Sequence, residues 1–262
     1  MLRALYTAAS GMEAQQFNID TIAHNLANVN TAGFKQRRTQ FQDLLYQDIR
    51  NAGTSNTAST EIPVGLQVGL GTKPVATTMI FTQGDFAATN RALDIVIQGQ
   101  GFFQVRQPNG QIAYTRNGNF NLSRDGSLVT SDGDPLDPQI TIPEDNIGIM
   151  IGADGTVSVV QPEQTQPQQV GKIEIATFQN PAGLQGIGKN LLLATQASGD
   201  AITGTPGESG LGTLLSGFIE QSNVSVVEEM VNMIISQRAY EANSKVIRTA
   251  DEMLTQANNV IR

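Results

Sequence analysis

Apolar residues recur every seven positions along the last part of the chain. They are Val226, Met233, Tyr240, Ile247, Leu254 and Ile261, and Met230, Ala250 and Ala257 share their face. This repeat predicts a long helix with one narrow apolar stripe. Ser225 followed by Glu228 has the pattern of a capping box, which places the start of the helix there. At about 36 residues the helix would be roughly 54 Å long, so its stripe needs a partner from elsewhere.

The first thirty or so residues repeat the same theme. One row contains Leu5, Met12, Ile19 and Leu26, and a second contains Ala8, Gln15, Ile22 and Val29. These rows predict a helix over residues 3–30 that Gly33 would stop. The simplest burial for two narrow stripes is against each other, as a coiled coil, and against further copies of the chain. The expected subunit-interface residues are Leu5, Met12, Ile19, Ile22, Leu26, Val226, Met230, Met233, Tyr240, Ile247, Leu254 and Ile261.

Between the two helices the chain has the pattern of a turn-rich β protein. Asn-Gly or Asp-Gly pairs stand at 109–110, 117–118, 125–126, 132–133 and 154–155. Such pairs supply the positive φ angles that tight hairpins require. Short apolar runs between them, such as 93–97, 102–105 and 112–115, predict strands. The sequence therefore predicts an antiparallel meander or small barrel over residues 91–184.

The segment before this β region predicts an extended arm. Residues 51–60 have almost no apolar side chains, whereas apolar residues alternate with others from Val64 to Leu70. The Gly-rich stretch 199–217 is expected to run back beside residues 61–86. The predicted class is thus α+β in three regions. These are a terminal helical domain (1–33 and 222–262), an arm and linker (34–90 and 185–221) and an outer β domain (91–184).

Composition excludes several classes of function. The net charge of −8 disfavours a nucleic-acid partner, because neutralising phosphates needs clustered Lys and Arg. The absence of Cys excludes thiolate chemistry and Cys-ligated metals. No apolar run is long enough for a transmembrane helix, and the first residues lack the pattern of a cleavable signal peptide. His24 is the single histidine, with no second ligand beside it.

Two stretches imitate chemical motifs without completing them. Residues 183–189 fit the spacing of a P-loop, but Asn190 stands where a hydroxyl should hold Mg²⁺ and no helix pattern follows. Asp132, Asp134 and Asp137 suggest a Ca²⁺ loop, yet the glycine and glutamate of that motif are missing. We therefore expect no catalytic, cofactor or metal site.

Three long motifs stand out along the chain. The first runs from Ala9 to Met12 and on through Ile22–Lys35, and the second is Asn232–Ile247 followed by Thr249–Leu254. The third comprises Gly99–Gln104, Ala113–Gly118 and Gly126–Thr130. Together they span most of the chain, and they resemble the motifs of the bacterial flagellar rod and hook proteins. The absence of a larger inserted β domain, with the segment 41–75, favours a rod member over a hook member.

The resemblance implies a structural subunit of the distal rod, with a proximal rod or hook-type axial protein as the alternative. Terminal helices of many copies would form the inner wall of a hollow helical tube that transmits torque, with the β domain outside. The arm would brace neighbouring subunits. The implied partners are copies of the chain, proximal rod proteins, the hook protein, the peptidoglycan and outer-membrane bushing rings, the rod cap and the flagellar export apparatus. The implied location is the periplasm-spanning rod, reached by type III export without a cleaved signal.

Two functions from other classes compete with this interpretation. A secreted carbohydrate-binding module would need exposed aromatic platforms, but the chain has no Trp and four Tyr. An NTP-binding enzyme would depend on the incomplete motif at residues 183–189.

Overall fold

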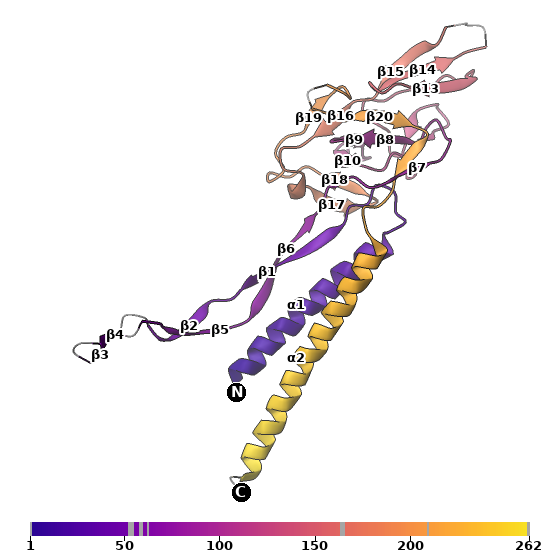
Figure 1. The fold of residues 1–262 in the computed structure, drawn as a ribbon. Helices are drawn as coiled ribbons and strands as arrows, with labels where there is room; N and C mark the ends of the chain where they lie inside the picture. Colours follow the sequence, from indigo (N-terminus) through magenta and orange to yellow (C-terminus); the bar gives the residue numbers. More distant parts are fainter. Residues whose placement is uncertain are drawn as a thin grey trace. The chain divides into compact units, whose positions relative to one another are not determined.

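The computed structural model describes residues 2–51, 55–57, 60–61, 63–162, 166–208 and 210–260, and its fold is α+β (Figure 1). The chain forms two compact units. The first contains Met1–Ala27, Arg37–Thr78 and Ser225–Arg262, and the second contains Asn28–Gln36 and Met79–Val224.

Two long helices dominate the first unit. Helix α1 (Leu2–Ala27) and helix α2 (Val226–Val260) pack side by side, with the start of α1 and the end of α2 at the same end of the pair (Figure 1). At 26 and 35 residues they measure about 39 and 52 Å. The N–H of Glu228 donates to Ser225 Oγ at 3.5 Å, so Ser225 caps α2 as predicted. Within the described residues, neither helix has the length and apolar character needed to cross a membrane.

Helix α1 ends earlier than the sequence predicts. It stops at Ala27, and Gly33 belongs to the second unit. Gly33 has φ +70°, and a Cβ there would lie 2.6 Å from the backbone nitrogen of Asn117. Close packing of two backbones, and not a helix C-cap, therefore requires this glycine.

The arm of the first unit is a chain of two-stranded antiparallel pairs. β1 (Arg37–Asp43) pairs with β6 (Thr72–Met79), β2 (Tyr46–Arg50) with β5 (Leu66–Gly69), and β3 (Ser55–Thr57) with β4 (Thr60–Glu61). The expectation that residues 199–217 run beside residues 61–86 is wrong, because the partner strands of β5 and β6 come from residues 37–50. Half of the predicted loop at 51–60 lies outside the described residues.

The second unit is built from short strands. They are β7 (Phe86–Ala88), β8 (Ile95–Gln98), β9 (Phe102–Arg106), β10 (Ile112–Thr115), β11 (Asn121–Leu122), β12 (Leu128–Val129), β13 (Gly148–Ile151), β14 (Thr156–Val160), β15 (Gln168–Lys172), β16 (Ile175–Thr177), β17 (Gln185–Gly188), β18 (Leu191–Leu193), β19 (Ile202–Gly204), β20 (Thr213–Ser216) and β21 (Phe218–Glu220), with one 3-10 turn at Pro181–Gly183.

The largest sheet has six strands in the order β17-β18-β10-β9-β16-β19, and β13-β14-β15 form a second sheet. β20 pairs with β8 and β21 with β7. In the described part of the chain β17 and β19 are the edges of the six-stranded sheet. The sheet is therefore open, and the small-barrel alternative is wrong.

Most of the predicted turns form, and one does not. Gly110, Gly126 and Gly155 have φ of +84°, +74° and +83°, and they close the β9–β10, β11–β12 and β13–β14 hairpins. Gly118 makes no such turn. A Cβ there would lie 1.6 Å from the carbonyl oxygen of Ile95, so the glycine serves to let two backbones meet.

The core of the second unit lies under these strands. Ile95, Phe103, Phe120, Leu128 and Ile175 are fully or almost fully buried. The rings of Phe103 and Phe120 meet edge to face, with centroids 5.1 Å apart. Burying each of these side chains contributes on the order of 2 kcal/mol. The described residues of the first unit form no comparable apolar core.

The stretch that imitates a P-loop forms a hairpin. Residues 185–188 are strand β17, and Lys189 and Asn190 turn the chain with φ of +54° and +58° into β18. The ammonium of Lys189 lies 3.6 Å from the carboxylate of Asp132 on the surface. Because a strand follows Lys189, this segment has no helix N-terminus with which to hold phosphate.

Candidate assembly surface

The face of α2 that packs on α1 is lined mainly by small and polar side chains. Glu229, Ser236 and Ala250 are at least 97% buried, and they share one seven-residue row with Asn243. The apolar row predicted from the sequence lies beside it, with Met233, Ile247 and Leu254 half-buried. We call the facing residues of the two helices the α1–α2 seam.

Polar contacts cross the α1–α2 seam at two levels. Asn18 Nδ2 donates to Ser236 Oγ at 2.8 Å, and Asn25 Nδ2 lies 3.4 Å from Glu229 Oε1. The amide of Asn25 also exchanges two hydrogen bonds with the backbone of Arg37, at 2.8 and 2.9 Å. Buried polar pairs of this kind fix the register of two helices at some cost in stability.

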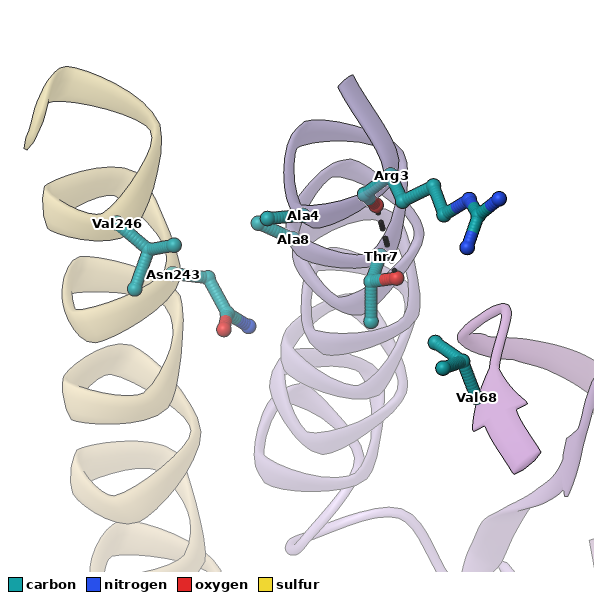
Figure 2. Close-up of a pocket in the computed structure, with 7 residues that line it drawn as sticks. All are labelled: Arg3, Ala4, Thr7, Ala8, Val68, Asn243 and Val246. Atoms are coloured by element: carbon teal, nitrogen blue, oxygen red, sulfur yellow. Dashed lines mark hydrogen bonds between the residues drawn. The ribbon is translucent and has the colours of Figure 1, made fainter. Parts of the chain in front are cut away.

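Gly11 allows α1 and α2 to approach closely in the region between these polar contacts and the free ends of the two helices. A Cβ at Gly11 would lie 2.9 Å from the side-chain nitrogen of Asn243. Further along, Ala8 is buried, and Figure 2 shows Ala4 and Ala8 pointing from α1 toward Asn243 and Val246 of α2. Small residues thus replace the large apolar side chains that usually fill such a seam.

An open groove of about 500 Å³ follows this end of the pair. It is lined by Arg3, Ala4, Thr7, Ala8, Val68, Asn243 and Val246 (Figure 2). Val68 comes from β5 of the arm, and the hydroxyl of Thr7 donates to the carbonyl of Arg3 at 3.0 Å. Among the described residues that line the groove, Arg3 has the one ionisable side chain, and they contain no general acid–base pair.

The opposite face of α2 carries large apolar side chains in its first turns. Val227, Met230, Val231, Ile234 and Ile235 are 50–72% exposed. From Gln237 onward the exposed face becomes largely polar and charged. We call Val227, Met230, Val231, Ile234 and Ile235 the outer apolar patch. Burying each against a partner would contribute on the order of 1 kcal/mol.

The predicted subunit-interface residues divide into three groups. Ile22 is buried on α1, and Leu5, Met12, Ile19 and Leu26 are half-buried there with Met233, Ile247 and Leu254 of α2. Val226, Met230 and Tyr240 are exposed. Ile261 lies outside the described residues. The first group therefore supports the helix pair itself, and the second is available for contacts with other molecules.

Sequence reasoning missed the polar half of the α1–α2 seam and most of the outer apolar patch. A signal for the first was present, since Asn18 and Asn25 are seven apart, as are Glu229, Ser236 and Asn243. A search for apolar repeats passes over such rows because their members are polar.

The composition of the α1–α2 seam leads to a prediction for the dilute monomer. Most of the large apolar side chains between the helices are only half-buried, so ordering the helices offsets little of its entropic cost. Limited proteolysis followed by mass spectrometry should remove residues 1–30 and 225–262 and leave the β strands of the second unit intact. Full protection of both ends in a verified monomer would contradict this expectation.

Three family models match the chain. "Flagella basal body rod protein" matches residues 5–35, "Flagellar hook protein FlgE/F/G D1 domain" residues 96–159, and "Flagellar basal body rod FlgEFG protein C-terminal" residues 215–260. The flagellar basal-body rod protein FlgG of Borreliella burgdorferi is 52% identical over the full length of both chains. The proteins of that name in Caulobacter vibrioides and Bacillus subtilis are 49% and 41% identical, also at full length. The chain belongs to the flagellar basal-body rod family.

Family membership establishes the class of function. Rod proteins are structural subunits of the flagellar basal body, so the chain is a structural protein and not an enzyme. The matched C-terminal region, residues 215–260, contains helix α2, strand β21 and the last two residues of β20. The outer apolar patch and the α1–α2 seam therefore lie in segments that define this family.

Proposed function

We propose that the chain is a subunit of the distal rod and that copies of it polymerise into a hollow helical tube that transmits torque. The outer apolar patch carries the proposal, because an isolated molecule has no described side chains covering it. A contact repeated between all neighbouring subunits would bury these residues in every copy of the chain. The paired helices would form the inner layer of the tube as a coiled coil, and residues 91–184 the outer layer.

The exposed side chains of the arm support contacts with neighbouring copies. Leu45, Tyr46 and Ile49 are 53–85% exposed, and Leu66 on the facing strand is 51% exposed. A two-stranded ribbon cannot bury such residues by itself. We infer that the arm lies on an adjacent subunit and braces it.

The remaining partners follow from the place of a distal rod in the basal body. They are the proximal rod proteins, the hook protein, the bushing rings, the rod cap and the export apparatus. The alternative is a proximal rod or hook-type axial protein of the same family. A relative at 30% identity is named flagellar hook-basal body complex protein FlhP, from Bacillus subtilis.

Replacing Ile234 by aspartate should abolish polymerisation and leave the monomer folded. Ile234 is 51% exposed, so the charge meets water in the monomer but would be buried in the polymer, at a cost of several kcal/mol for each contact. Electron microscopy of the purified protein counts the tubes, and circular dichroism checks the fold.

Thr249→Asp is the matched control, because it adds the same charge to an exposed position of α2 outside the patch. Tubes from the control and none from Ile234→Asp would support the proposal. Normal tubes from Ile234→Asp would remove the outer apolar patch from the assembly, and the absence of tubes from the unmodified chain under all conditions would count against the rod function.

A further inference from the structure

Three segments of the second unit lead to the points where the chain enters and leaves the first unit. They are residues 28–36, 79–85 and 217–224, and we call them the connecting segments. Any load passed along the chain between the helices and the β strands of the second unit travels through them. The contacts that hold the connecting segments therefore affect how load is transmitted along the chain.

The carboxylate of Glu220 holds all three connecting segments. It is 99% buried on β21 and accepts a hydrogen bond from Lys35 Nζ at 2.6 Å and one from the N–H of Gly84 at 3.0 Å. The backbone carbonyl of Glu220 accepts a hydrogen bond from the N–H of Gly33 at 2.9 Å. Arg116, which follows β10, lies 3.5 Å from the second carboxylate oxygen and connects the cluster to the sheet.

Both cations make further hydrogen bonds within this cluster. Lys35 Nζ also donates to the carbonyl of Thr82 at 2.7 Å. Arg116 donates to the carbonyls of Ile97 and Gly99 at 3.2 and 2.6 Å. Burial lowers the pKa of both Lys35 and Arg116, and the charge of Glu220 opposes that shift. One carboxylate therefore balances two desolvated cations.

Asn223 provides a second tie across the same segments. The N–H of Gln36 donates to Asn223 Oδ1 at 2.7 Å, and Asn223 Nδ2 donates to the carbonyl of Ile80 at 2.9 Å and to the hydroxyl of Thr82 at 2.8 Å. Packing adds a third constraint, because a Cβ at Gly84 would lie 2.1 Å from the carbonyl oxygen of Gln221.

We propose that Glu220 and Asn223 form a clasp that locks the three connecting segments into one cooperative joint, through which torque passes between the helices and the β strands. The mechanical part rests on the proposed function as a rod subunit, whereas the cooperative part does not. A joint of this kind opens as a whole, since no segment can move without breaking bonds to the other two.

Hydrogen–deuterium exchange on the purified full-length chain tests the cooperative part, with Asn223→Ala and Gly84→Ala as separate variants. Each should raise the exchange rates of the Gly33, Gln36 and Ile80 amides together, by roughly tenfold or more. The amides of β9 and β10 should keep their rates. Gly148→Ala is the control, because a Cβ there meets nothing within 4 Å.

The outcomes separate the possibilities. A rise confined to Gln36, the direct partner of Asn223, would overturn the joint, and so would an equal rise in β9 and β10. Electron microscopy of Asn223→Ala tubes tests the load-bearing role, for which we expect greater bending than in tubes of the unmodified chain. Equal stiffness or loss of assembly would overturn that role, whereas failure of the unmodified chain to form tubes would count against the rod function instead.

Discussion

Replacing Glu220 by glutamine should lower the free energy of unfolding of the second unit by about 3–5 kcal/mol. The change keeps the shape of the side chain but leaves Lys35 and Arg116 buried without a carboxylate. Removing one partner of a buried ion cluster is costly because the remaining charge is neither solvated nor paired. Urea denaturation followed by the β signal in circular dichroism measures the loss.

Two variants show whether the charge balance is the cause. Lys35→Met leaves one cation for the carboxylate and should cost less, about 1–2 kcal/mol, mainly for the lost hydrogen bonds. Asp132→Asn makes the same chemical change as Glu220→Gln in an exposed pair and should shift stability by less than about 1 kcal/mol. Equal effects of all three variants would contradict this account.

Introducing aspartate at Ile247 should separate the helices and prevent polymerisation. Ile247 is half-buried in the α1–α2 seam, and a charge there costs several kcal/mol if it stays dry. The polar and small residues around it bury too little apolar surface to compensate. Electron microscopy should show no tubes, while the second unit should unfold at the same urea concentration as in the unmodified chain.

The control for Ile247→Asp is Glu241→Ala, which changes an exposed residue of the same helix. It should leave tube formation nearly unchanged. Normal assembly of the Ile247→Asp chain would show that the α1–α2 seam is not needed in the polymer, and the outer apolar patch would then have to carry the contact alone.

The helices and most hairpins were predictable because their signals are local. A seven-residue apolar repeat follows directly from helical geometry. Gly110, Gly126 and Gly155 are the residues that tight turns demand. Gly118 shows the limit of this reasoning, since its sequence context is the same but its role is to let the backbone approach Ile95. That contact depends on the folded sheet, and the sequence around Gly118 gives no signal of it.

Long-range choices were not predictable for a related reason. Strands β5 and β6 of the arm pair with residues 37–50 instead of 199–217, although both stretches contain residues that suit a strand. Lys35 and Glu220 lie 185 residues apart, and the sequence around neither residue indicates that the two form a pair. The polar rows of the α1–α2 seam were visible in principle, but a polar repeat also describes a solvated face.

The polar levels of the α1–α2 seam affect how easily the chain can be unwound. Water can replace the hydrogen bonds of Asn18 and Asn25 one for one, so pulling the helices apart takes little work. The largest and driest core lies in the second unit and has no part in that step. A protein arranged in this way can release its two terminal helices first when it is drawn through a channel too narrow for folded structure, and the polar contacts can restore the register when the helices pair again.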